Sequence, residues 1–493
     1  MNKHKVMIVT AALLLSNAMS GIDSTIVNTA MPAIIADLHG IELMGWVVAI
    51  FLLGTAVSTP LWSKLGERVG NKLAYQLAAV FFVLGSLLQG LAPNMLFLII
   101  SRAIAGIGNG GMVSLPYIIY AQLYANPRKR MQVLGLVSAS YSTATIIGPL
   151  IGGYIVDSFG WHWVFYLNVP IGLISAIAVQ VFFNEKRRAQ RDTAVDYLGA
   201  VLLTIGLSAL LTATELIGAV AGWIVLLLFV FALLVIALLI RIETHAADPI
   251  IPARLFRNHE LLIDFALFMI IWGAFMGFVI YAPMWAQGLL GVSALIGGAT
   301  QIPASFANFA GSGVVAPLRR HFSPQQVIAI GTWTLTAAFI IMALLGKHGA
   351  YWLLLVAGAL QGFGNGACFN ELQVKVQQDA EPQDVPSATS FSFLIRMLSQ
   401  TFIASIFGII MNHALRRGVQ TSGGQISMKM MNKLSDAGSA KLLPQHLLPA
   451  MRTIMHNGLH NIMLLSLVMM LVAAGINLWA LRRERRQAVK VPA

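Results

Sequence analysis

The sequence predicts an all-α integral membrane protein with fourteen transmembrane spans. Three observations predict this fold class: extreme hydrophobicity, basic residues concentrated in alternate loops, and an internal repeat. Of the 493 residues, 57% are hydrophobic and 10% are charged, and the mean hydropathy is +0.77. A soluble domain carries about 25% charged residues. We therefore expect most of the surface to face lipid.

The spans are placed by the rule that about 20 apolar helical residues cross a bilayer core. The N-terminus resembles a secretory signal, because Lys3 and Lys5 precede an apolar stretch, but the apolar character continues past Asp23. We therefore expect an uncleaved first span. The predicted spans lie near 8–30, 44–64, 73–92, 96–120, 133–156, 164–183, 197–217, 222–241, 262–285, 294–316, 326–346, 350–372, 387–411 and 458–480.

Basic residues assign a topology to these spans. They cluster in the segments that are cytoplasmic if the N-terminus is inside, and the first five external loops contain no lysine or arginine. This is the positive-inside rule, so we expect a bacterial inner-membrane protein with both termini in the cytoplasm. The last external segment, 413–457, is basic, but long loops translocate largely regardless of charge. We expect no nucleic-acid partner despite the formal charge of +13, because the basic residues lie in short clusters between apolar runs.

An internal repeat divides the chain. The sequence Gly-Ile-Gly-Asn-Gly at 106–110 recurs as Gly-Phe-Gly-Asn-Gly at 362–366, and Pro-Leu at 60–61 recurs at 317–318. Each pair is separated by eight spans, whereas two six-helix halves alone would separate them by six. We therefore predict an N-terminal six-helix half (1–190), two inserted central helices (191–245) and a C-terminal six-helix half (246–493). Duplicated halves around a central site are typical of secondary transporters.

The first span carries a carboxylate deep in an apolar helix. Asp23 lies in the sequence GIDSTIVNTAMP, at 21–32. A charged side chain inside a membrane is costly, so its default interpretation is functional. Asn17, Ser24 and Asn28 make the same span unusually polar, as expected of a helix that lines a substrate cavity. The alternative is a structural aspartate that is hydrogen-bonded between helices.

Further sequences of note follow in the next spans and loops. A guanidinium stays charged and needs a partner when it is buried, glycines allow tight turns and close helix contacts, and proline bends a helix. The relevant residues are Glu67, Arg68, Gly70 and Lys72 in SKLGERVGNK (63–72), Arg102 in ISRAIAG (100–106), Gly148, Pro149, Gly152 and Gly153 in GPLIGG (148–153), and the loop WHWVFYLNVP (161–170).

Together these sequences resemble the major facilitator superfamily, specifically its fourteen-helix branch of drug:proton antiporters, over essentially the whole chain. The resemblance implies a major facilitator fold, proton coupling at Asp23 and Arg102, a cytoplasmic gate in the 63–72 loop and an antiporter motif at 148–153. The alternatives are a helix–helix clamp for Arg102 and an ordinary topogenic loop for 63–72. The departures from the family pattern are Ser63, Asn71, Ala105, Ala144 and His162.

Other charged residues lie within or near the spans. Glu371 is a further candidate for proton coupling, and we predict that it pairs with Arg396. Glu215 and Asp264 lie near span ends and are interpreted as structural, and Asp157 is interpreted as interfacial.

Aromatic residues of the ninth span are candidates for the substrate cavity. Trp272 and Tyr281 could stack on a lipophilic cation. An interfacial aromatic belt is an equal alternative for them.

No catalytic signature is present in the sequence. It contains no GxxxxGK[ST] sequence for phosphate binding and no His or Cys cluster with zinc spacing, and its single cysteine, Cys368, lies in an apolar span. We therefore expect no enzyme activity and no ATP-driven transport. We also expect no cofactor and no metal ion.

The sequence predicts a monomeric, proton-driven secondary antiporter that exports amphipathic, cationic drugs or dyes across the inner membrane. Its partners would be small amphipathic substrates, protons and the lipid bilayer. The nearest alternative is an exporter of the same fold that is specific for one metabolite, lipid or siderophore. A non-transporting membrane sensor is the alternative of a different class, and it is disfavoured because we expect no soluble output domain.

Overall fold

The computed structural model describes residues 3–124, 127–185, 197–217, 220–243, 253–381 and 384–490, and its regular elements in these ranges are all helices. Eleven helical segments there are long and apolar enough to cross a membrane. The other three predicted spans coincide with α5 (Pro127–Phe159), α8 (Tyr197–Glu215), and α11 (Ala294–Ala299) followed by α12 (Gln301–Leu318). The chain is therefore an all-α multi-pass membrane protein.

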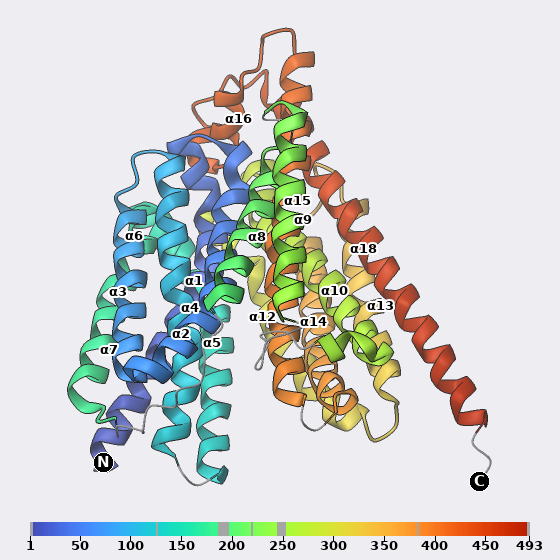
Figure 1. Ribbon diagram of the computed structural model, residues 1–493. Helices are drawn as coiled ribbons and strands as arrows, with labels where there is room; N and C mark the ends of the chain where they lie inside the picture. Colours follow the sequence, from blue (N-terminus) through green and yellow to red (C-terminus); the bar gives the residue numbers. More distant parts are fainter. Residues whose placement is uncertain are drawn as a thin grey trace. The chain divides into compact units, whose positions relative to one another are not determined.

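The helices form two compact units, which are described separately (Figure 1). Unit 1 comprises Met1–Leu239 and Ser293–Gly298, and unit 2 comprises Ile240–Val292 and Ala299–Ala493. Besides α5, α8 and α11, unit 1 contains α1 (Lys3–Leu38), η1 (Ile41–Leu43), α2 (Met44–Val69), α3 (Asn71–Gly90), α4 (Met95–Leu123), α6 (His162–Tyr166), α7 (Asn168–Phe182) and most of α9 (Gly222–Glu243). Besides α12, unit 2 contains η2 (Ala253–Arg257), α10 (His259–Met284), η3 (Trp285–Leu289), α13 (Pro324–Leu344), α14 (Tyr351–Asp379), α15 (Val385–Thr421), α16 (Met428–Leu434), α17 (Ala437–Ala440) and α18 (Leu448–Lys490).

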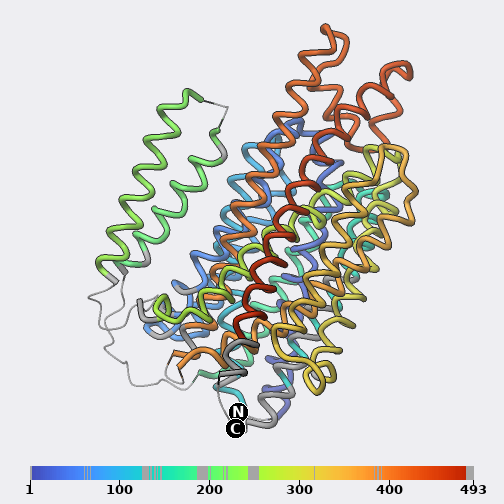
Figure 2. Tube along the Cα trace, turned by 90° about the vertical axis from the view of Figure 1, so that its right-hand side faces the viewer, coloured from blue at the N-terminus to red at the C-terminus, as the bar shows by residue number. Residues whose placement is uncertain are grey.

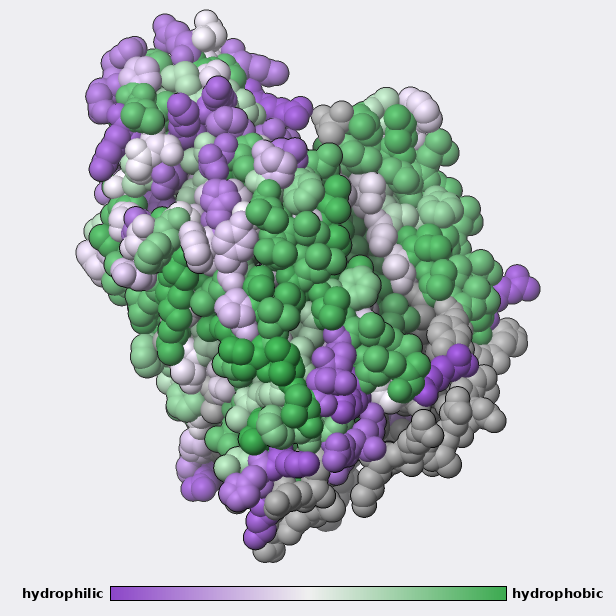
Figure 3. All heavy atoms as spheres, turned by 90° about the vertical axis from the view of Figure 1, so that its left-hand side faces the viewer, coloured by the Kyte–Doolittle hydropathy of each residue, from purple (hydrophilic) through white to green (hydrophobic). Residues whose placement is uncertain are grey.

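The helices present apolar side chains on their outer surface. α8 and α9 form a hairpin (Figure 2), in which Gly206 packs against Ile236. On α9, Leu226 and Leu234 are 63% and 64% exposed. In the view of Figure 3, hydrophobic residues cover the sides of the helices and hydrophilic residues gather at their ends. Such a surface is unfavourable in water and is stable in a bilayer, where helices satisfy their own backbone groups.

The glycine repeat of α4 is a helix-packing motif. Gly106 and Gly110 face α2, and Gly108 faces α3. A Cβ atom added at Gly106 would lie 2.5 Å from the carbonyl oxygen of Phe51. No side chain larger than hydrogen fits there, so glycine lets the two backbones approach closely.

The same arrangement occurs in α14. Gly362 and Gly366 face α12, and Gly364 faces α13, where an added Cβ would lie 2.5 Å from the carbonyl oxygen of Gly331. The repeat that the sequence contains is therefore reproduced as one packing of three helices in each unit.

Two segments differ from the predicted boundaries. The external loop predicted at 413–457 is largely helical, because α15 continues to Thr421 and α18 begins at Leu448. Hydropathy marks where a helix leaves the apolar layer, not where the helix ends. The predicted span 294–316 is divided between α11 and α12, and the segment Ser293–Gly298 belongs to unit 1.

Candidate functional site

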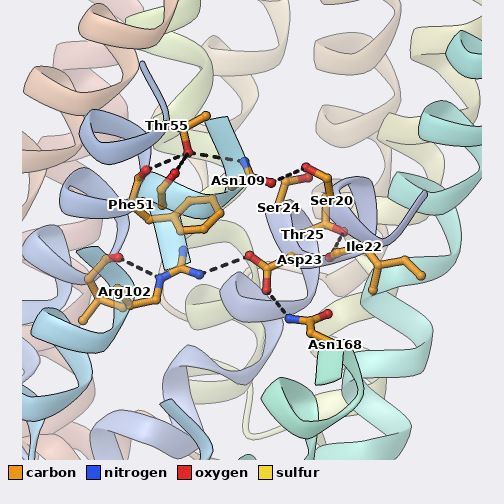
Figure 4. Close-up of polar contacts among 12 residues, drawn as sticks. Ser20, Ile22, Asp23, Ser24, Thr25, Phe51, Thr55, Arg102, Asn109 and Asn168 are labelled. Atoms are coloured by element: carbon orange, nitrogen blue, oxygen red, sulfur yellow. Dashed lines mark hydrogen bonds and ion pairs between the residues drawn. The ribbon is translucent and has the colours of Figure 1, made fainter. Parts of the chain in front are cut away.

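The centre of unit 1 contains a buried ion pair between α1 and α4 (Figure 4). Asp23 is 1% exposed and Arg102 is 3% exposed. The Nη1 atom of Arg102 lies 3.2 Å from Oδ2 of Asp23, and Nδ2 of Asn168, at the start of α7, donates to Oδ1 at 2.7 Å. Both carboxylate oxygens of Asp23 therefore have a partner.

The position of Arg102 is fixed by two contacts with α2. Its Nε donates to the backbone carbonyl of Val47 at 3.2 Å, and its guanidinium carbon lies 3.9 Å from the ring centroid of Phe51. A cation over an aromatic face gains electrostatic attraction that increases when water is excluded. The charge of Arg102 is thus compensated by a carboxylate, a carbonyl and a ring.

A neutral hydrogen-bond chain lies beside the ion pair. Ser20 Oγ donates to Asn109 Oδ1 at 2.7 Å, and Asn109 Nδ2 donates to Thr55 Oγ1 at 3.3 Å (Figure 4). These residues come from α1, α4 and α2. Three helices therefore meet in polar contacts at the level of Asp23. Of the residues labelled in Figure 4, only Asp23 carries a carboxylate.

The charges of Asp23 and Arg102 depend on each other. An ion pair in a low-dielectric interior is stable only while both charges are present, and loss of one charge leaves the other uncompensated. A proton or a cationic ligand at Asp23 would compete with Arg102 for the carboxylate. Neutralisation of Asp23 would therefore leave Arg102 without its counter-charge.

The other predicted cavity residues of α1 have local partners. Asn17 Nδ2 donates to the carbonyl of Val137 on α5 at 2.9 Å. Ser24 Oγ donates to the Gly21 carbonyl at 2.7 Å, and Asn28 Nδ2 donates to the Ser24 carbonyl at 3.2 Å.

The predicted cavity aromatics belong to unit 2 and are buried. Trp272 lies beside Phe369, with ring centroids 5.7 Å apart, and Tyr281 lies edge-on to Phe407 at 6.2 Å. Trp272 and Tyr281 are 4% and 0% exposed. An interfacial belt needs one polar end of the ring in water, so their burial disfavours that alternative. The same burial leaves neither ring open to a cation in this structure.

The glycines at 148–153 lie where α5 meets its neighbours. Gly148 contacts Thr25 on α1, and a Cβ added at Gly152 would lie 2.6 Å from Ile26 Cγ1. Gly153 contacts Leu295 of α11. Pro149 is inside α5.

The predicted gate loop contains a turn that requires glycine. Gly70 joins α2 to α3 with φ +97°, in the region that favours glycine. The backbone N–H groups of Asn71 and Lys72 donate to the Glu185 carboxylate at 2.8 and 3.0 Å. A carboxylate at a helix N-terminus compensates the helix dipole. Glu185 therefore ties the start of α3 to the chain that follows α7.

Of the other two predicted gate residues, Arg68 and Glu67, the structure describes the side chain of Arg68 alone. Arg68 is exposed on the last turn of α2. The side chain of Glu67 lies outside the described residues, as does that of Glu215.

In unit 2, the predicted pair of Glu371 and Arg396 is wrong. Glu371, which is fully buried, lies 3.4 Å from Nη1 of Arg319 at the end of α12. The Arg396 guanidinium lies over the rings of Phe393 and Phe369, at 4.8 and 4.9 Å. The reason is helix phase: Glu371 faces α12, whereas the guanidinium of Arg396 on α15 lies against aromatic rings.

The sequence analysis did not predict the buried cation Lys375 on α14. Lys375 Nζ lies 3.2 Å from Oδ1 of Asp264 on α10 and contacts Asp379 one turn along α14. Glu260 lies 3.8 Å from the same nitrogen and also pairs with Arg483 of α18. The interpretation of Asp264 as a structural residue agrees with these contacts.

Asp157 also has a defined structural contact. Its carboxylate accepts from the backbone N–H groups of Ala294 and Leu295 at 3.3 and 3.0 Å, within unit 1. Among the described residues, no group of three His, Cys, Asp or Glu side chains could hold a metal ion.

Several residues of the site were missed in the sequence. Asn168 lies in the tryptophan-rich loop at 161–170, and Asn109 lies in the glycine repeat at 106–110. Because both are polar residues within noted sequences, they could have been named as candidates from the sequence. Lys375 follows the predicted end of its span at 372, whereas α14 continues to Asp379. Glu185 follows α7 without any local pattern that indicates a helix cap.

Comparison with known proteins gives consistent matches over most of the chain. The family described as Major Facilitator Superfamily matches residues 13–404. Multidrug resistance protein 3 of Bacillus subtilis (strain 168) is 30% identical, with 94% of this chain and 93% of the relative covered. Multidrug transporter protein MdtP of the same organism is 28% identical, with 95% and 91% covered. Efflux pump bfoC of Aspergillus brasiliensis is 28% identical, with 85% and 76% covered.

Solved structures share the fold at low sequence identity. A bacterial homologue of the human lysosomal transporter Spinster, in an inward-facing and unoccupied conformation, has a TM-score of 0.71 at 15% identity, with 98% of both chains covered. A D-xylose–proton symporter has a TM-score of 0.56 at 16% identity, with 89% of this chain and 98% of the other covered.

Proposed function

This chain belongs to the Major Facilitator Superfamily, and from that premise we propose that it is a proton-driven secondary antiporter that exports amphipathic, cationic small molecules. The names of its relatives, a multidrug resistance protein and an efflux pump, support export. The single observation that carries the proposal is the buried contact between Asp23 and Arg102, completed by Asn168.

Proton binding at Asp23 provides the coupling step. With Asp23 charged, the carboxylate holds Arg102 at 3.2 Å. A proton on Asp23 removes this attraction and leaves a buried guanidinium without its counter-charge, which is unfavourable. A conformation in which Arg102 meets water or another acceptor then becomes favoured. A cationic substrate competes with the proton, because both neutralise the same carboxylate.

The direction of transport follows from the proton gradient. A proton that enters from the outside discharges the substrate, and its release to the cytoplasm restores the charged carboxylate. Exchange of one monovalent cation for one proton moves no net charge, so the pH gradient alone would drive it. Each further proton would add about 2.3 kcal/mol per 100 mV of membrane potential.

The Asp23→Asn substitution in proteoliposomes with an imposed pH gradient tests this proposal. The variant keeps the shape of the side chain and locks it neutral. We expect the protein to insert normally, to lose gradient-driven dye efflux down to the rate of empty liposomes, and to bind cationic dyes more weakly. The measurement is dye efflux with and without the gradient.

A second carboxylate on the same helix gives the matched control. Asp37, near the end of α1, is exposed and accepts a hydrogen bond from Trp161 Nε1 at 2.9 Å. Asp37→Asn should retain gradient-driven efflux. Full proton-coupled efflux in Asp23→Asn would place coupling elsewhere, with Glu371 and Asp264 as the next candidates.

The range of substrates separates broad export from the specific alternative. Extrusion of several unrelated cationic dyes supports multidrug export. Extrusion of a single metabolite, lipid or siderophore, with no dye transported, would support an exporter of the same fold with one substrate.

A further inference from the structure

Unit 2 contains a cavity of about 210 Å³ at the N-terminal end of α18. Three of its lining side chains carry basic nitrogen groups: Lys347 and His348 from the segment that joins α13 to α14, and Arg452 from α18. The remaining lining residues are Gln445, Leu448 and Pro449. We refer to it as the Lys347–Arg452 cavity.

The cations of this cavity have no carboxylate partner among the described residues. None of the ion pairs formed in the described ranges involves Lys347 or Arg452. Lys347 Nζ donates to the Thr453 hydroxyl at 3.0 Å, and Nε of Arg452 is buried without a hydrogen-bond acceptor. Two like charges around one cavity repel each other, and a buried donor without an acceptor is unfavourable. An anion with several acceptor oxygens would remove both costs.

Large apolar side chains are exposed next to the segment that lines the cavity. Leu344, at the end of α13, is 81% exposed, and Trp352, in the first turn of α14, is 60% exposed. Both residues flank the segment that carries Lys347 and His348. Large apolar and tryptophan side chains at span ends mark the boundary between hydrocarbon and headgroups. We therefore expect the basic side chains to lie at the depth of lipid headgroups.

We propose that the Lys347–Arg452 cavity binds the phosphate group of an anionic membrane phospholipid. The phosphate offers acceptor oxygens to the Arg452 guanidinium and to the Lys347 ammonium, and the acyl chains would run along the apolar surface beside Leu344. Arginine suits oxyanions because its planar group donates several hydrogen bonds in a fixed geometry. The site is separate from the ion pairs of α14, and it does not depend on the transported substrate.

Lipid binding to the full-length protein in a neutral detergent tests the proposal. Native mass spectrometry would measure the affinity for phosphatidylglycerol, with phosphatidylcholine and inorganic phosphate as comparison ligands. We expect saturable binding of phosphatidylglycerol, and about fivefold weaker binding in each of the variants Lys347→Gln and Arg452→Gln, because one basic residue near an anionic headgroup contributes about this factor. Arg452→Lys keeps the charge but not the planar donor group, so its affinity should fall between that of the unmodified protein and that of Arg452→Gln.

Lys429→Gln is the matched control. Lys429 is exposed on α16, outside the lining of the cavity, and its replacement should leave the affinity unchanged. Binding of inorganic phosphate to the cavity without phosphatidylglycerol binding would overturn the lipid assignment in favour of a free-anion site. Equal loss of lipid binding in Lys429→Gln and Arg452→Gln would overturn the site itself. An unchanged thermal transition without lipid would establish that the variants are folded.

Discussion

Lys375 illustrates how one side chain can balance several buried charges. It contacts Asp264 on α10 and Asp379 on α14, and its side chain is 7% exposed. Together with Glu260 and Arg483, the cluster contains three carboxylates and two cations. An ammonium can meet several acceptors because it presents three donors around a point charge. Asp23, in contrast, has the guanidinium of Arg102 as its one cation among the described residues.

Replacement of Lys375 by methionine should destabilise unit 2. The Lys375→Met variant keeps most of the length of the side chain but leaves fully buried Asp264 without a cation. Removal of one partner of a buried pair costs about 3–5 kcal/mol. We therefore expect a lower thermal transition, measured on the purified protein in detergent.

A double variant separates charge from packing in this prediction. Asp264→Asn combined with Lys375→Met removes both members of the most deeply buried pair of this cluster, so it should recover most of the lost stability. If the double variant is as unstable as Lys375→Met, the loss comes from packing and the charge argument is wrong.

The sequence predicted these residues unequally. Asp23 stands alone in an apolar run, and its burial follows from that run. Lys375 lies beyond the apolar window of its span. It is buried in the protein because α14 continues past that window to Asp379. The Glu371–Arg319 pair depends on the phase of α14 relative to α12, which hydropathy does not contain. Burial of a charge within an apolar run was therefore predictable, whereas helix phase and partner identity required coordinates.

At the scale of elements, the packing of α5 against α1 and α11 depends on glycine. Gly148 and Gly152 face α1, and Gly153 faces α11. Between helices in lipid there is no hydrophobic driving force, so association depends on close packing, which small residues allow. The glycine pattern was visible in the sequence, but its neighbours were not, because α11 is distant along the chain and lies inside a predicted span.

Replacement of Gly152 by leucine should block transport without preventing insertion. A Cβ at this position would already lie 2.6 Å from Ile26 Cγ1, so a branched side chain must push α5 away from α1. Overpacking of this kind costs about 1–3 kcal/mol. We expect normal membrane levels and strongly reduced dye efflux in everted vesicles.

Gly475→Leu provides the comparison for this variant. Gly475 lies on α18 with no neighbouring atom within 4 Å of an added Cβ, so its replacement adds the same bulk without a clash. It should retain efflux. Normal efflux in Gly152→Leu would mean that the α1–α5 contact has no role in the transport cycle.

At the scale of the whole molecule, the two units repeat more than their glycines. Each has a carboxylate on its first long helix and a cation on the glycine-rich helix: Asp23 and Arg102 in unit 1, Asp264 and Lys375 in unit 2. The depths differ, since Asp23 lies in the middle of α1 and Asp264 in the second turn of α10. Equivalent helices therefore carry charges at different levels, as expected if the duplicated halves have acquired different tasks.

The charge distribution also predicts the orientation of the protein in its membrane, with the α15–α18 connection outside and the α12–α13 loop inside. Gln425 and His321 are exposed residues of these two segments, and the native Cys368 is fully buried and so gives little background. A membrane-impermeant maleimide added to intact cells should label Gln425→Cys at once and His321→Cys only after permeabilisation. Labelling of His321→Cys in intact cells, with Gln425→Cys protected, would invert the topology and with it the direction proposed for proton entry.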